Sequence, residues 1–173
     1  MNKQAIILIL VSLLLIIAQA IVFNHVSLWG VAMPFVFIYI LVKLPVNLSL
    51  SWLFTISFAV GLIIDIFSDT MGMNALACTL TMALRRPIIH LYFNRDEEIS
   101  DPYPGIKTFG SFTFAKYVLT LTLVYCTLIF FIETFSVFRI TRLLICIGAS
   151  TLLTTILIIC IDSLTVRKGE KRL

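Results

Sequence analysis

The chain has 173 residues, of which 60% are apolar and 13% are charged, and its mean hydropathy is +1.08. Soluble globular domains carry about 45–50% apolar and about 25% charged residues, so this composition excludes a soluble enzyme, a nucleic-acid-binding domain and a disordered tail. The formal net charge of +4 comes from Lys and Arg that flank long uncharged runs, which is the pattern of a small polytopic membrane protein.

Six apolar runs predict an all-α integral membrane protein in a single domain, residues 1–173. At a rise of about 1.5 Å per residue, about 20 residues cross a hydrocarbon core of about 30 Å. The runs 28–42 and 71–84 are shorter than this, so they must borrow flanking residues, thin the bilayer or be re-entrant. With flanking residues included, the six expected short helices are 5–23, 28–45, 46–66, 72–93, 113–133 and 143–163.

The Lys and Arg residues lie mostly on one side of these expected helices. With the N-terminus inside, the inner segments contain eleven of them, and the outer segments contain only Arg139 and Arg142. The positive-inside rule therefore predicts that both termini are cytoplasmic. The inner loop 94–112 is the only long polar stretch, and we expect the basic tail 164–173 to lie on anionic lipid headgroups.

The start of the chain also resembles a secretory signal peptide. Lys3 precedes an apolar run, and Ala18, Gln19 and Ala20 have the pattern of a cleavage site. Because this run is long for the core of such a signal, we expect residues 5–23 to be retained as the first helix.

The sequence offers little for catalysis or metal binding. Asp65 and Asp69 are one helical turn apart, whereas an intramembrane aspartyl protease needs its two acids on different helices. We therefore expect this pair to end the third helix and solvate the following turn, and we expect no enzymatic activity and no cofactor. The cysteines lack C-x-x-C spacing and a nearby His, which is typical of small apolar core residues; they are Cys78, Cys126, Cys146 and Cys160.

Polar and small residues recur at helical spacing on four of the expected helices. Each set lies on one face, which in a membrane protein turns toward other helices. Close helix packing explains such faces, and a polar cavity for a small ligand is the alternative. The sets are Ser57, Gly61 and Asp65; Asn74, Cys78, Thr81 and Arg85; Lys116, Thr120 and Thr127; and Thr151, Thr155 and Asp162. Asp162 and Glu133 lie near helix ends, so we interpret them as boundary charges.

Residues 61–76 resemble the signature of a known family. Gly61 is followed by Asp65 after three residues, and Gly72, Ala75 and Leu76 come next. This pattern is similar to the G-x-x-x-D…G-x-x-A-L signature of the rod shape-determining protein MreD family. Chain length, the six-helix pattern, short loops and the basic C-terminal tail are also similar to that family.

The resemblance implies a fold similar to the substrate-binding subunits of energy-coupling-factor transporters. It also implies a non-enzymatic scaffold in the bacterial cytoplasmic membrane, in contact with membrane lipids and not with nucleic acid. Such a scaffold binds MreC, a single-span membrane protein, and indirectly links the MreB filament inside to the cell-wall elongation synthases outside, which maintains rod shape.

Within the motif we expect a role for each of three residues. Gly61 permits close packing, Asp65 fixes the outer turn through backbone N–H groups, and Gly72 supplies a position with positive φ. Ala75 and Leu76 complete the candidate partner-contact motif. We also expect the aromatic-rich fifth helix to supply partner surface, through Tyr117, Tyr125, Phe130 and Phe131.

The alternative function is a vitamin-type substrate-binding subunit of an energy-coupling-factor transporter. Such a subunit usually has longer polar and aromatic outer loops, whereas the expected outer loops here are short: 24–27, 65–70 and 133–142. It also carries an Ala-rich patch on its first helix, where this chain has only Ala18 and Ala20. Both observations favour the scaffold.

Overall fold

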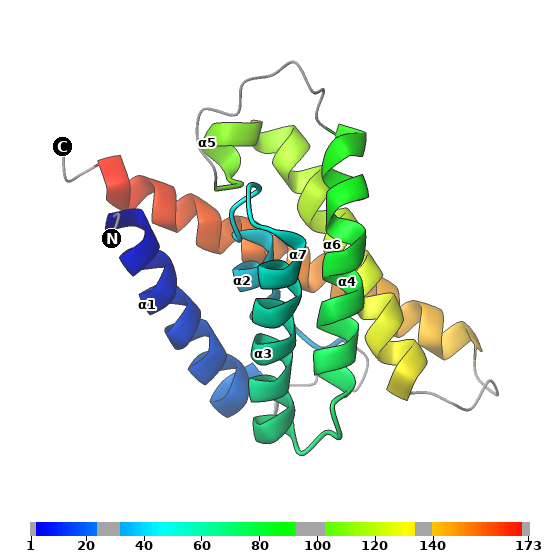
Figure 1. The fold of residues 1–173 in the computed structure, drawn as a ribbon. Coiled ribbons are helices and arrows are strands. Elements are labelled where there is room, and N and C mark those ends of the chain that lie inside the picture. The colour runs from blue at the N-terminus through cyan, green and yellow to red at the C-terminus, as the bar shows by residue number, and fades with distance from the viewer. Residues whose placement is uncertain (1–2, 24–31, 93–102, 134–139, 171–173) are drawn as a thin grey trace.

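The described residues are helical apart from turns and one irregular segment. The computed structural model describes residues 3–23, 32–92, 103–133 and 140–170 (Figure 1). No β-strand occurs within these ranges, so the expectation of an all-α protein is confirmed for them. The elements in chain order are α1 (Lys3–Ala18), the π-helix η1 (Gln19–Phe23), α2 (Ile38–Val42), α3 (Leu50–Ser68), α4 (Met73–Tyr92), α5 (Ile106–Phe109), α6 (Ser111–Glu133) and α7 (Ile140–Glu170).

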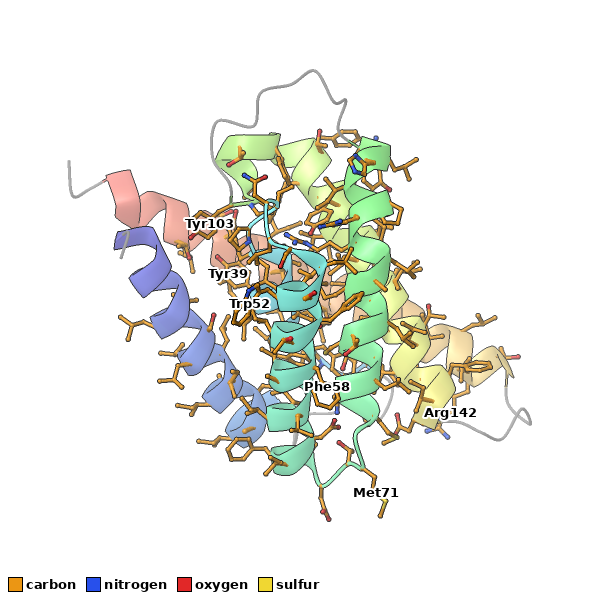
Figure 2. All side chains as sticks on the ribbon, viewed as in Figure 1. Tyr39, Trp52, Phe58, Met71, Tyr103 and Arg142 are labelled. Carbon is orange, nitrogen blue, oxygen red and sulfur yellow. The ribbon has the colours of Figure 1, made fainter. Side chains whose placement is uncertain are left out.

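Among the residues that the structure describes, three helices are long and apolar enough to cross a membrane, as expected for a membrane protein. They are α3, α6 and the part of α7 from Thr141 to Thr165. Large apolar side chains project outward from the bundle, among them Trp52 and Phe58 of α3 (Figure 2). Burying such side chains in lipid instead of water is what a spanning helix requires. The helix α4 is not one of these three, because the polar side chains of Asn74, Arg85 and Arg86 lower its apolar content.

The largest difference from the expected helices lies at 28–45. Residues 28–31 are outside the described ranges, residues 32–37 are irregular, and only Ile38–Val42 form the helix α2. Pro34 and Pro45 give the physical reason, because proline lacks an N–H and disfavours helix at the residue before it. N–H groups of the irregular segment instead form hydrogen bonds with side chains of other elements. Inside a membrane there is no water to pair with such groups, so they need partners within the protein.

Side chains from two helices provide these partners. The N–H groups of Met33 and Phe35 donate to the hydroxyls of Ser150 and Thr154 on α7, at 3.0 and 3.1 Å. Gln19 of η1 is buried and makes two bonds, accepting from the Val36 N–H and donating to the Pro34 carbonyl. The segment 32–37 is therefore held between η1 and α7.

The other boundaries differ less. The helix α4 covers 73–92 against an expected 72–93, and it continues past the internal Pro87. The expected loop 94–112 contains the short α5 and the first two residues of α6, while its residues 94–102 lie outside the described ranges. The helix α7 continues to Glu170, into the expected tail 164–173, because Lys and Arg are good helix formers. Arg139 is not among the described residues.

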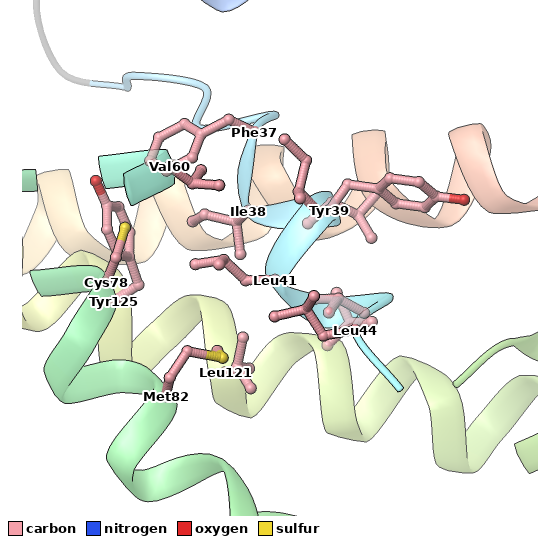
Figure 3. Packing of buried hydrophobic residues seen from close by; sticks show 14 of the residues in the cluster. Phe37, Ile38, Tyr39, Leu41, Leu44, Val60, Cys78, Met82, Leu121 and Tyr125 are labelled. Carbon is pink, nitrogen blue, oxygen red and sulfur yellow. The ribbon is translucent and has the colours of Figure 1, made fainter. Parts of the chain in front are cut away.

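The core surrounds α2. All five residues of α2 are buried, as is usual for a helix that is apolar on every side. Figure 3 shows Ile38 and Leu41 of α2 among side chains of α4 and α6, including Met82 and Leu121. The helices α3, α4, α6 and α7 pack in chain order, and the α3–α4 turn lies at the opposite end of the molecule from α5 (Figure 1).

Candidate functional site

The helices α3 and α4 approach most closely at Gly61. A Cβ atom at this position would lie 2.5 Å from the Cα atom of Ala75 and 2.7 Å from the carbonyl oxygen of Asn74. Real side chains do not tolerate such distances to backbone. Because Gly61 has no side chain, the two helix backbones can touch at this position, which is the role expected for it.

Asp65 lies one turn further along α3 and its carboxylate is buried, with only 3% of the residue exposed. Its Oδ2 accepts the N–H of Ala75 at 2.8 Å, and its Oδ1 accepts the N–H of Asn74 at 3.0 Å. The Asn74 amide and the Thr70 hydroxyl also donate to Oδ1, at 2.9 and 2.5 Å. The carboxylate thus binds the N–H groups of the second and third residues of α4, where a negative charge is stabilised by the helix dipole.

The turn between the helices explains why Asp65 is needed. Asp69 ends α3 with φ 54°, and Gly72 precedes α4 with φ 75°. Gly72 occupies the position where a Ser, Thr, Asp or Asn side chain usually caps a helix, and it has no side chain to do so. Asp65 provides the missing cap from the neighbouring helix. The backbone roles expected for Asp65 and Gly72 agree with this geometry.

One further hydrogen bond connects this turn to α6. The Tyr125 hydroxyl donates to Oδ1 of Asn74 at 2.5 Å, and Tyr125 is fully buried. Its ring packs edge-to-face on Phe35 and Phe37, with centroids 5.2 and 5.6 Å apart. We call Asp65, Thr70, Asn74 and Tyr125 the Asp65 network; it joins α3, α4 and α6 to the irregular segment 32–37.

The geometry corrects the expectation that Asp65 and Asp69 solvate the turn. Asp69 is exposed, but Asp65 is buried and accepts four hydrogen bonds from residues 70–75. These partners are all donors, which matches the acceptor oxygens of the carboxyl group. Two carboxyls that share a proton, as in an aspartyl protease, would need a different arrangement. The role of the network is structural: its hydrogen bonds fix the turn between α3 and α4.

Leu76, the last residue of the motif, points outward. It is 50% exposed, and Ile66, Phe67 and Met71, which lie close to it along the chain on either side of Asp69, are exposed as well. We call these four residues the turn surface. The motif therefore has a buried part, which includes Gly61 and Asp65, and an apolar exterior around the turn.

A second buried polar cluster joins α2, α5 and α7. Asp162 is fully buried and pairs with Lys43, whose Nζ lies 2.5 Å from Oδ1. The Tyr39 hydroxyl donates to the same carboxylate at 3.2 Å, and the Ile106 N–H donates to Oδ2 at 3.1 Å. The interpretation of Asp162 as a boundary charge is therefore wrong, because the helix continues beyond it and turns it inward.

Three of the four polar faces predicted from spacing point inward. Every member of the sets on α3, α4 and α7 is buried: Ser57, Gly61, Asp65, Asn74, Cys78, Thr81, Arg85, Thr151, Thr155 and Asp162. The α6 set is wrong. Lys116 and Thr127 are exposed, and the Thr127 hydroxyl bonds to a carbonyl of its own helix. Of this set, Thr120 is half-buried, and its hydroxyl lies 2.8 Å from that of Tyr92 on α4.

The aromatic surface expected on α6 is largely inside the protein. Tyr117 and Tyr125 are fully buried and Phe130 is 7% exposed, so only Phe131 of that set remains on the surface. Tyr117 accepts a hydrogen bond from Arg85 Nε at 3.0 Å. The phenolic hydroxyls, each near an inward polar residue of α4, are the signal that distinguishes these tyrosines from surface aromatics.

Comparisons of this chain with protein-family models, with curated proteins and with solved structures found no match. The described part of the chain supports a class: a helical membrane protein in which a buried carboxylate fixes the turn between two closely packed helices.

Proposed function

We propose that this chain is a non-enzymatic membrane scaffold of the MreD type, which binds an MreC-like single-span protein. The observation that supports the proposal is that the residues of the resemblance act as one unit. Gly61 contacts Ala75, Asp65 caps α4, and Gly72 has the positive φ of the turn. The three residues thus all act on the same turn between α3 and α4.

The turn surface is the proposed partner site. Its four side chains are apolar and exposed, and the Asp65 network holds the backbone beneath them. A rigid apolar surface binds a partner helix at low entropic cost, because little of it must be ordered on binding. Through this contact the scaffold links the cytoplasmic MreB filament indirectly to the peptidoglycan synthases outside.

The proposed orientation places both termini in the cytoplasm and the turn surface outside, in the bacterial cytoplasmic membrane. The excess of Lys and Arg in the inner segments supports this orientation. In Figure 1 the α3–α4 turn lies away from α5, the start of α1 and the end of α7. An MreC-like partner has its large part on the same outer side as this turn.

The interior near the turn argues against the vitamin-binding alternative. A substrate-binding subunit needs space between its helices on the outer side. Here Tyr125 lies between Asn74 and the rings of Phe35 and Phe37, and all of these contacts are at packing or hydrogen-bond distance. The described residues fill the region under the turn with aromatic side chains.

The test is affinity purification of the tagged full-length protein from its native membrane in mild detergent, with mass spectrometry of the proteins recovered. We expect a single-span coiled-coil protein together with cell-wall synthases. Recovery of ATP-binding-cassette ATPases with a coupling subunit would overturn the scaffold and establish the transport alternative.

A further inference from the structure

A cavity of about 260 Å³ lies between the segment before α3 and the last turns of α4. Pockets for drug-sized ligands measure about 300–1,000 Å³, so this space suits a smaller polar group. We call it the Arg86 pocket. The lining residues that matter for its chemistry are Asn47, Leu48, Leu53, Arg85, Arg86 and His90.

Two adjacent guanidinium groups line the pocket without an acidic partner in the described part of the chain. Arg85 is buried and donates to the Leu44 and Pro45 carbonyls and to the Tyr117 hydroxyl, all of which are neutral. Arg86 is exposed and donates to the Leu48 carbonyl at 3.2 Å. Within the described ranges, the ion pair is between Lys43 and Asp162, so neither arginine takes part in one.

Such an arrangement favours an anion. A buried charge is costly unless it is paired, and a guanidinium has five N–H donors, more than these carbonyls and hydroxyl use. Its planar fork fits the oxygens of a phosphate group with two parallel hydrogen bonds. The Asn47 amide and the His90 ring supply further donors at the rim, while Leu53 supplies an apolar wall.

The pocket also lies where a spanning helix begins. Trp52, in the first turn of α3, is 63% exposed. Tryptophan side chains on spanning helices gather at the level of the lipid headgroups. The pocket therefore opens at headgroup depth, and basic pockets between helices at this depth are suited to anionic lipids.

We infer that the Arg86 pocket binds the phosphate of an anionic membrane lipid, with Arg85 and Arg86 as its principal donors. Binding is reversible and involves no covalent step. The inference does not depend on the proposed partner, because it rests only on the pocket, its charges and its position at the start of a membrane-spanning helix.

The test is native mass spectrometry of the purified full-length protein, with phosphatidylglycerol added at increasing concentration. The variant is Arg86→Gln, which removes one exposed charge and leaves the buried Arg85 in place. The matched control is Lys116→Gln, because Lys116 is an exposed cation near the start of α6 outside the pocket. We expect one lipid per chain, bound about tenfold more weakly by Arg86→Gln and equally well by Lys116→Gln.

Two further ligands identify the source of the phosphate. Diacylglycerol, which lacks the phosphate, is expected not to bind at the concentrations used. Inorganic phosphate, tested by thermal shift because it has no acyl chains, is expected to leave the melting temperature unchanged at concentrations where phosphatidylglycerol raises it. Equal weakening by the two variants, equal binding of diacylglycerol, or equal stabilisation by inorganic phosphate would each overturn the inference.

Discussion

Asp65 caps α4 from the preceding helix, whereas a capping residue usually stands directly before the helix that it caps. The chain needs a residue with positive φ just before α4, and Gly72 meets that need but has no side chain. The carboxylate of Asp65 then accepts the N–H groups of Asn74 and Ala75 from the end of the preceding helix. A single side chain thus stabilises the start of α4 and its position against α3.

Replacing Asp65 by Asn removes the charge that these donors surround. We expect the free energy of unfolding to fall by about 2 kcal/mol, since hydrogen bonds to a charged group contribute about 1.5–3 kcal/mol. Asp69→Asn is the control, because Asp69 is exposed and Asn tolerates its left-handed backbone. Unfolding in a mixed detergent series measures both, and equal losses would contradict the capping role.

Gly61 offers a second comparison at this scale. Gly61→Ala places a methyl group against the backbone of Ala75, so we expect a loss of about 1–3 kcal/mol through overpacking. The control is Gly148→Ala in α7, where a Cβ atom has nothing within 4 Å. Alanine favours a helix by up to about 1 kcal/mol relative to glycine, so this control is expected to melt no lower than the wild type.

The close contact at Gly61 and the left-handed turn at Gly72 could be predicted from the sequence, because both follow from residues near each other in the chain. The partnership of Asn74 with Tyr125 could not. Helical spacing shows which residues share a face, and it does not show which face of another helix they meet. For the same reason the ion pair between Lys43 and Asp162 could not be predicted, since its two residues lie far apart in the sequence.

At the scale of elements, the irregular segment 32–37 depends on α7 for its hydrogen bonds. Its N–H groups have no helix to join, because Pro34 interrupts the helix predicted there. The hydroxyls of Ser150 and Thr154 accept the hydrogen bonds that a helix would otherwise provide. The side chain of Gln19 does the same for the N–H group of Val36. The spacing of Thr151 and Thr155 predicted an inward face of α7, but the hydroxyls that bind this backbone belong to Ser150 and Thr154, which are outside the predicted set.

Thr154→Val tests this dependence while keeping the shape of the side chain. The Phe35 N–H then loses its acceptor, and we expect a loss of about 1–3 kcal/mol in stability. Thr127→Val is the control, since the Thr127 hydroxyl is exposed and bonds to its own helix. Thermal unfolding of both variants measures the difference. A control as unstable as Thr154→Val would contradict a specific role for the hydrogen bond between Phe35 and Thr154.

The Lys43–Asp162 pair joins α2 to α7 and makes a different prediction. Lys43→Met leaves the buried Asp162 carboxylate without its counter-ion, so we expect a loss of about 3–5 kcal/mol. The double variant Lys43→Met, Asp162→Leu removes both charges and is expected to recover much of that stability. A double variant less stable than Lys43→Met would show that the pair is not what couples the two helices.

At the scale of the whole molecule, buried polar clusters connect elements around an apolar core, and large apolar side chains also lie on the exterior. The Asp65 network, the Asp162 cluster and the Arg85 contacts each join elements that are not neighbours in the chain. Composition was enough to predict a helical membrane protein, and the described residues agree with it. Composition did not predict the short α2, because hydropathy does not distinguish a spanning helix from a buried apolar segment.

The central claim is that the turn fixed by Asp65 presents the surface on which a single-span partner docks. Photo-crosslinking in the native membrane tests it, with the reactive amino acid at Leu76 and, as control, at Leu91, which is exposed at the opposite end of α4. The account predicts a crosslink from position 76 to a single-span coiled-coil protein, and none from position 91. Equal crosslinking at both positions, or a crosslink from 76 to a transporter coupling subunit, would contradict it.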